Sequence, residues 1–254
     1  MNTKQDYIGL FDSGVGGISV LRHMVRLMPN ERYLYIGDSA NAPYGTKSKE
    51  QVRELSFAMA EKLMARGIKA LVVACNTATS AAINELRSAY PDLIVVGIEP
   101  ALKLAADRFP TGNLGVMATP MTLREEKFDL LLHRFDSACK VSKIPAPGLV
   151  ELIEQGKGDS EEAEILLKSL LKDYIGSLDA LVLGCTHYPF AAEAISRVLG
   201  EQVMLLDGGD GTARETKRRL AQAGLLSDGQ GQILIENSNP DPKIIALAYR
   251  LLNE

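Results

Sequence analysis

Residues 71–80 read LVVACNTATS, and the predicted fold depends on this stretch. Residues 71–74 are apolar and typical of a short buried strand, and the polar residues after them are suited to capping a new helix. Cys75 therefore lies at a strand-to-helix corner. In an open α/β sheet such corners meet at the carboxyl ends of the strands, where ligands bind, and the N–H groups of the opening helix favour a thiolate or a carboxylate. A buried structural cysteine is the alternative interpretation.

A second stretch repeats the same design. Residues 181–189 read LVLGCTHYP, an apolar run followed by a cysteine, polar residues and a proline suited to the first turn of a helix. Cys185 falls 110 positions after Cys75, and GVMAT ends at Thr119, 106 positions after GLFDS ends at Ser13. We infer two related halves, each with a hydroxyl residue after its first strand and a cysteine after a later one. If the halves face one another, the two cysteines also do.

These offsets predict an α/β protein with two similar three-layer α/β/α domains and mainly parallel sheets. We expect the domains to be related by pseudo-two-fold symmetry, with the active site at their interface. Residues 1–98 plus 208–254 are predicted to form a discontinuous domain that carries the first cysteine. Residues 99–207 are predicted to form an inserted domain that carries the second, because Glu99-Pro100 and Asp207-Gly208-Gly209 interrupt the pattern of strands and helices.

Composition narrows the class of protein. The 254 residues are 46% hydrophobic and 24% charged, which is typical of a globular chain, and no apolar run approaches the roughly 20 residues that a membrane span needs. Three cysteines do not resemble a disulfide framework, and the first strand begins too early for a signal peptide, so we expect a cytoplasmic protein. A net charge of −4 does not favour a nucleic-acid partner.

Polar residues of the first half gather after its predicted strands. Asp12 and Ser13 follow the strand at residues 7–11 and open a glycine-rich turn, but neither a G-x-G-x-x-G pattern nor a phosphate-binding G-K-[ST] is present, so a nucleotide cofactor is disfavoured. Residues 37–48, GDSANAPYGTKS, follow the next strand. Their composition is compatible with a simple turn, while Tyr44 and Gly45 offer O–H and N–H donors to a carboxylate.

The second half has its own candidates. His187 lies two residues after Cys185, where it can orient or polarise the thiol. Glu154 and Glu151 lie on a short predicted helix at residues 149–155, and Thr119 is suited to capping a helix that begins at Pro120. A metal site formed by both cysteines and His187 matches no common zinc spacing, so no metal is expected. Cys139, near the start of a strand with no polar turn after it, is interpreted as structural.

Two opposed cysteines indicate proton transfer at one carbon. A thiolate on one face removes a proton and a thiol on the other face returns one, which inverts the stereocentre. A hydrolase with one nucleophilic cysteine is the rival, but it explains only one of the two corners. Small polar residues beside the thiols would hold an amino acid in place: Ser13, Asn76, Thr77 and Thr186.

Four motifs, FDSGVGG, DSANAPYG, VVACNTAT and LGCTHYP, resemble those of the glutamate racemases in the aspartate/glutamate racemase superfamily, and the resemblance covers essentially the whole chain. It implies a cofactor-independent enzyme, usually a homodimer, that supplies D-glutamate for bacterial peptidoglycan. Cys75 and Cys185 would be the acid/base pair, flanked by Asp12 and His187, with Glu154 as a further acid. The residues that would hold glutamate are Asp12, Ser13, Tyr44, Gly45, Asn76, Thr77, Thr119, Thr186 and His187.

Two points stay open at this stage. Aspartate or another amino acid is an alternative substrate, because pocket length cannot be obtained from motif spacing. Glu151 is as compatible as Glu154 with the family's loosely matched acidic segment. The chain also has Gly208 where many members of the family have serine.

Overall fold

The structure, a computed structural model, describes residues 3–124 and 139–254, and the chain divides into two compact units. Unit 1 comprises Met1–Glu99 and Gly209–Glu254, and unit 2 comprises Pro100–Gly208. The elements of unit 1 are β1 (Tyr7–Asp12), α1 (Ile18–Leu27), β2 (Arg32–Gly37), η1 (Ser39–Asn41), η2 (Tyr44–Thr46), α2 (Lys49–Met64), β3 (Ile68–Val73), α3 (Asn76–Ala89), β4 (Ile94–Gly97), α10 (Gly209–Gln222), β9 (Gln232–Asn237) and α11 (Pro242–Asn253). Those of unit 2 are α4 (Leu102–Arg108), β5 (Asn113–Ala118), α5 (Pro120–Arg124), β6 (Lys140–Pro145), α7 (Leu149–Glu154), α8 (Glu161–Leu171), β7 (Ala180–Leu183), η3 (Tyr188–Ala191), α9 (Ala192–Leu199) and β8 (Met204–Asp207).

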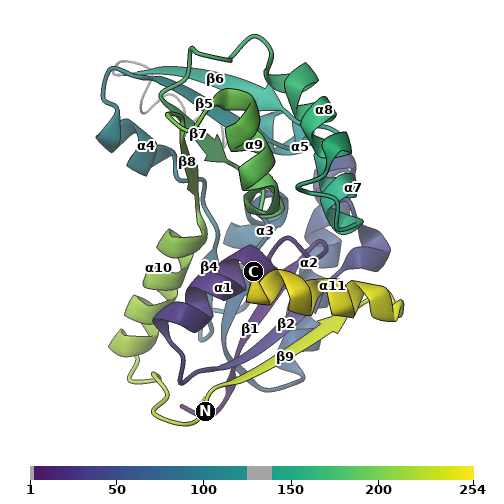
Figure 1. The fold of residues 1–254 in the computed structure, drawn as a ribbon. Coiled ribbons are helices and arrows are strands. Elements are labelled where there is room, and N and C mark those ends of the chain that lie inside the picture. The colour runs from purple at the N-terminus through teal and green to yellow at the C-terminus, as the bar shows by residue number, and fades with distance from the viewer. Residues whose placement is uncertain (1–2, 125–138) are drawn as a thin grey trace. The chain divides into compact units, whose positions relative to one another are not determined.

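Unit 1 is built on a five-stranded parallel sheet in the order β4-β3-β1-β2-β9. Helices α2 and α3 pack against each other over one face, and α1 packs against α10 and α11 over the other (Figure 1). Every residue of the central strand β3 is buried, as expected for a parallel strand covered on both faces. The predicted α/β class is confirmed.

Unit 2 is built on a four-stranded parallel sheet in the order β6-β5-β7-β8. If β5 is matched to β1 and β7 to β3, as the motif offsets suggest, this order corresponds to β2-β1-β3-β4 of the first sheet. The cysteine-bearing strand is then in the same place in both sheets. The repeat predicted from the spacing of Cys75 and Cys185 is therefore present in the strand order.

The strands of unit 2 send alternate side chains into two separate apolar clusters. On β7, Leu181 and Leu183 join one cluster, which the buried residues of α7, α8 and α9 complete. Ala180 and Val182 join the other, with residues of α4 and with Cys139. Unit 2 is thus also a three-layer structure, and Cys139 is part of its core.

The two cysteine corners differ in how the next helix begins. The cap predicted after residue 74 is Cys75 itself, so α3 begins at Asn76. Pro189 lies in the 3-10 turn η3, and α9 begins only at Ala192. The sequence pattern predicts neither α4, which is short, nor α8, although Ser160 caps α8 and acidic residues fill its first turn.

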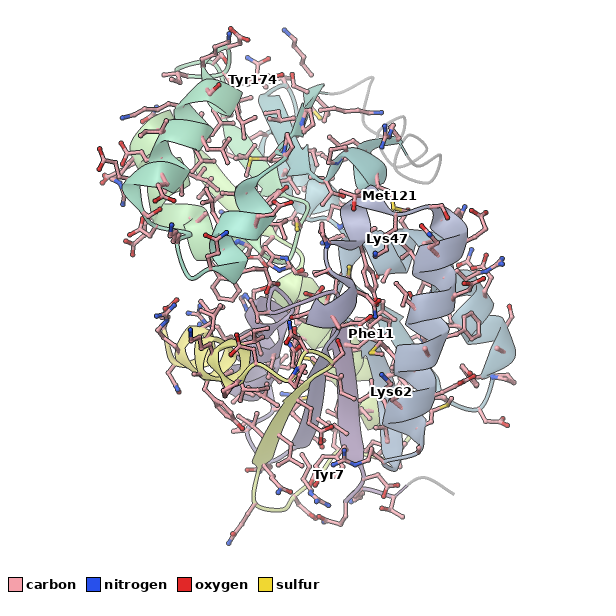
Figure 2. All side chains as sticks on the ribbon, turned by 90° about the vertical axis from the view of Figure 1, so that its right-hand side faces the viewer. Tyr7, Phe11, Lys47, Lys62, Met121 and Tyr174 are labelled. Atoms are coloured by element: carbon pink, nitrogen blue, oxygen red, sulfur yellow. The ribbon has the colours of Figure 1, made fainter. Side chains whose placement is uncertain are left out.

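The predicted site residues of unit 1 follow the carboxyl ends of its strands. Tyr7 and Phe11 lie near the two ends of β1, and Asp12 completes that strand (Figure 2). Lys47 precedes α2 and Lys62 lies near its end, so α2 runs antiparallel to β1 (Figure 2). Among residues 3–124 and 139–254, no helix has the length and apolar character needed to cross a lipid bilayer.

A buried ion pair holds the opposite end of this sheet. Lys69 Nζ, on β3, lies 2.6 Å from Glu31 Oε2, and both side chains are almost fully buried. The ammonium also donates to the carbonyls of Lys4 and Leu225, and Glu31 Oε1 accepts from the Ser227 N–H. All three ammonium protons can therefore be bonded, which compensates for the loss of hydration.

We expect Lys69→Met to destabilise the fold strongly, because it leaves the Glu31 carboxylate buried without its cation. The free energy of unfolding in urea should fall by about 3–5 kcal/mol. Lys103→Met is the matched control, since Lys103 and Asp107 form an ion pair with side chains that are 76% and 59% exposed. Equal effects of the two substitutions would contradict a stabilising role of the buried pair.

Candidate active site

The corner after β3 fixes the Cys75 thiol at the start of a helix. Cys75 has extended backbone angles and is the N-cap of α3, and its Sγ accepts a hydrogen bond from the Ala78 N–H at 3.4 Å. The side chain is buried, and Sγ lies 3.9 Å from Ser13 Oγ. The structure thus brings together two of the predicted site residues, which are 62 positions apart in the sequence.

The loop after β1 is ordered by the side chain of its first residue. Asp12 is fully buried, and its Oδ2 accepts from the N–H groups of Gly14 and Gly17 at 3.2 and 3.1 Å. A Cβ on Gly17 would come within 2.7 Å of the Asp12 Cβ, so this turn needs glycine. Asp12 therefore determines the path of the loop that carries Ser13 past Cys75.

Tyr44 belongs to the same group of side chains. Its hydroxyl donates to Asp38 Oδ2 at 2.7 Å, and Asn41 Nδ2 donates to both oxygens of Asp38. Burial, the bond to Asp38 and the negative charges of Asp38, Cys75 and Asp12 raise the pKa of Tyr44 far above its usual value, so the hydroxyl stays protonated. Asp38 was not among the predicted site residues, although it stands in the quoted motif DSANAPYG.

Three further predicted residues of unit 1 lie at the same ends of the strands. Gly45 is buried beside Tyr44 in η2, and Asn76 and Thr77 are buried in the first turn of α3. In the part of the chain that the structure describes, Asn76 Oδ1 is a buried acceptor without a hydrogen-bond partner. Such an atom is costly unless a ligand donor satisfies it, and an ammonium group is a suitable donor.

Unit 2 arranges its cysteine in a different chemical setting. His187 Nδ1 lies 3.7 Å from Cys185 Sγ, and His187 Nε2 lies 2.7 Å from Glu154 Oε1. Cys185 and His187 are buried, while the Glu154 side chain is 19% exposed. The contact to His187 thus comes from Glu154, at the end of α7. Neighbouring Glu151 contributes a negative charge that acts on Tyr188.

The imidazole of His187 favours its protonated form. Burial by itself works to lower the pKa of His187, but hydrogen bonds to Cys185 and Glu154, together with their negative charges, raise it well above the ordinary 6.5. In the imidazolium both ring nitrogens are donors, one toward the sulfur and one toward the carboxylate. The ring can therefore stabilise a thiolate at Cys185 while Glu154 stabilises the ring.

The remaining predicted residues of unit 2 follow β5 and β7. Thr119 caps α5 as predicted, since its Oγ1 accepts from the Thr122 N–H at 3.3 Å and lies 3.0 Å from Thr122 Oγ1. Thr186 is buried between Cys185 and His187. Tyr188 was not singled out, although it lies in LGCTHYP, and its hydroxyl donates to the Ala146 carbonyl at 3.2 Å in the loop before α7.

The described residues include three cysteines but no candidate metal site. Cys75, Cys139 and Cys185 are buried, and no disulfide bond joins them in the part of the chain that the structure describes. Within the described ranges, 3–124 and 139–254, no three His, Cys, Asp or Glu side chains form a group that could hold a metal ion.

Each of the two α/β units thus holds a buried cysteine just beyond an interior strand of its parallel sheet. The family model for Asp/Glu/Hydantoin racemase matches residues 8–216. The chain therefore belongs to the Asp/Glu/hydantoin racemase family.

Individual relatives extend this match over the whole chain. A glutamate racemase of Clostridium botulinum is 48% identical over 255 residues, covering 99% of this chain and 99% of its own. The crystal structure of a Bacillus anthracis glutamate racemase isoform superposes on this chain with a TM-score of 0.89 at 33% identity. The match covers 99% of this chain and 95% of the other. The Francisella tularensis enzyme, solved in complex with D-glutamate, has a TM-score of 0.86 at 27% identity, with 99% and 95% covered.

We expect Glu154→Gln to lower the pKa of His187, because it removes one of the two anions that favour the imidazolium. The raised pKa contributes stability that is present in full below the ordinary value of about 6.5 and is lost as the pH rises through the raised value. Relative to the wild type, the variant should therefore lose most free energy of unfolding at about pH 6 and progressively less at higher pH. NMR titration of the imidazole and urea unfolding at several pH values would measure both effects.

Glu151→Gln is the matched control, since it removes a carboxylate from the same helix. It should leave the titration of His187 close to that of the wild type. A larger shift from Glu151→Gln than from Glu154→Gln would contradict the assigned contact.

Proposed function

We propose that this protein is a glutamate racemase that interconverts L- and D-glutamate by a two-base mechanism without a cofactor. The observation that carries the proposal is the pair of buried thiols, Cys75 and Cys185, each just beyond a central strand of its own parallel sheet. Full-length similarity to glutamate racemases and the D-glutamate in the Francisella tularensis structure support the substrate.

In the proposed reaction one cysteine begins as a thiolate and the other as a thiol. The thiolate takes the α-proton and forms an S–H bond, while the electron pair of the broken C–H bond remains on the α-carbon. The thiol on the opposite face gives its proton to that electron pair, and its own S–H pair stays on sulfur. The product has inverted configuration, and the two cysteines have exchanged protonation states.

The residues of unit 1 are proposed to hold the substrate and the first thiol. Asn76 Oδ1, a buried acceptor without a partner in the described part of the chain, would accept a hydrogen bond from the α-ammonium group. The Tyr44–Gly45 segment and Thr77 would donate to a carboxylate. Asp12 supports Ser13 through the loop, and Ser13 Oγ, 3.9 Å from Cys75 Sγ, would assist the thiol.

The residues of unit 2 are proposed to tune the second thiol. An imidazolium at His187, 3.7 Å from Cys185 Sγ, would favour the thiolate and leave the sulfur ready to accept a proton. Glu154 would keep His187 charged through the 2.7 Å contact to Nε2. Thr186 and Thr119 are proposed to contact the substrate with their hydroxyl or N–H groups.

The proposed product has a defined use. The family resemblance indicates that D-glutamate is made for peptidoglycan. Because the proposed chemistry requires reduced thiols, a reducing compartment such as the cytoplasm suits the enzyme. The homodimer and the absence of a cofactor, both expected from the resemblance, stay predictions.

The proposed function predicts that chelator-dialysed protein racemises either enantiomer of glutamate with no added metal, pyridoxal phosphate or nucleotide. Circular dichroism would follow the loss of optical activity, and proton NMR in D₂O would follow exchange at the α-carbon. Release of ammonia or acid without exchange at that carbon would indicate a hydrolase. Faster turnover of aspartate would preserve the mechanism but overturn the substrate assignment.

The paired-thiol mechanism predicts that Cys75→Ala and Cys185→Ala each reduce the rate of racemisation by at least about a thousand-fold. Conversion of either enantiomer needs a thiol on both faces of the α-carbon, so the loss of one thiol stops conversion of both enantiomers. Cys139→Ala is the matched control, since Cys139 is comparably buried but lies just before β6 and not at the carboxyl end of a strand. It should keep near-normal kcat and KM for glutamate. An inactive but folded Cys139→Ala variant would show that the thiols have been assigned wrongly.

A further inference from the structure

A buried tyrosine in unit 1 contacts the loop that lies beside Cys75. Tyr35, on β2, is almost fully buried, and its hydroxyl donates to the Gly14 carbonyl at 2.6 Å. Gly14 directly follows Ser13, and its N–H donates to Asp12 Oδ2. Both backbone groups of Gly14 are therefore bonded to buried side chains, one from β1 and one from β2.

The loop is also pressed closely against the end of β2. A Cβ on Gly37 would come within 2.5 Å of the Gly14 oxygen. A Cβ on Gly17 would come within 3.0 Å of Tyr35 Cε2. The ring and hydroxyl of Tyr35 therefore contact the loop at two points, and the loop has little room to move toward β2.

We propose that Tyr35 is a positioning residue for the Cys75 half of the reaction. Its hydroxyl holds the Gly14 carbonyl, and through the loop it keeps Ser13 Oγ at its 3.9 Å distance from Cys75 Sγ. This inference rests on the proposed racemase function. A small displacement of a group beside a reacting atom lowers the rate far more than it lowers stability, because alignment contributes a large part of the rate.

The same strand provides a matched control. Tyr33 lies two residues before Tyr35 on β2, so its side chain points to the same face of the sheet. It is equally buried, and its hydroxyl donates to the carbonyls of Met24 and Met28 at 2.9 and 2.8 Å. Tyr33 thus makes the same kind of bond at the end of α1, away from the loop.

The experiment compares Tyr35→Phe with Tyr33→Phe, each of which removes one buried hydroxyl and keeps the ring. Thermal midpoints should fall by comparable amounts, since each variant loses one buried O–H donor to backbone carbonyl oxygen. Tyr35→Phe should lower kcat/KM about ten-fold, equally from D- and L-glutamate because the enantiomers have equal free energy. Tyr33→Phe should leave kcat/KM near the wild-type value.

The isotope effect of α-deuterated glutamate distinguishes positioning from a general loss of structure. If the proton transfer at Cys75 is slowed, the isotope effect should rise when the substrate is the enantiomer whose α-proton Cys75 removes. It should fall when the substrate is the other enantiomer, whose α-proton Cys185 removes. Ser13→Ala should produce the same asymmetry, and Tyr35→Phe should cost less in the Ser13→Ala background than alone.

Equal changes in the two isotope effects, or additive losses in the double variant, would overturn the inference while leaving the racemase function intact. The same holds if Tyr33→Phe lowers kcat/KM as much as Tyr35→Phe does. If Tyr35→Phe does not fold, Ser13→Ala alone still tests the loop, and a symmetric isotope effect in that variant overturns the inference. A wild-type protein that racemises neither enantiomer would overturn the proposed function and this inference together.

Discussion

The hydrogen bond from the Ala78 N–H to the Cys75 sulfur joins the end of a fully buried strand to the first turn of a helix. Helices cover both faces of the sheet, so the chain leaves the core only at the ends of its strands, and polar groups collect there. Because the sulfur itself caps α3, its place is set by the backbone of the corner. The loop after β1 and the segment around Tyr44 are then arranged about that fixed point.

The two units use one strand order but surround their cysteines with different chemistry. Cys75 lies beside the Ser13 hydroxyl and the Ala78 N–H, whereas Cys185 lies beside His187, whose other ring nitrogen contacts Glu154. One strand order therefore carries two different sets of contacts around the two thiols.

In unit 1, a buried ion pair and the candidate site residues lie at opposite ends of the sheet. The buried pair of Lys69 and Glu31 joins β3 to residues 4, 225 and 227 at one end. Tyr33 makes its two bonds to the last turn and C-cap of α1, whereas Tyr35, two residues later, reaches the loop at the carboxyl end.

The sequence by itself determined the α/β class, the repeat and the two cysteine corners, because strand and helix periodicity and capping depend on neighbours in the chain. It could not choose between Glu151 and Glu154, which lie three residues apart on one short helix. The contact of Glu154 with His187, 33 positions away, exists only in the tertiary structure. The tertiary structure also paired Tyr35 with Gly14 and set Ser13 beside Cys75, because parallel strands carry residues distant in sequence to the same end of a sheet.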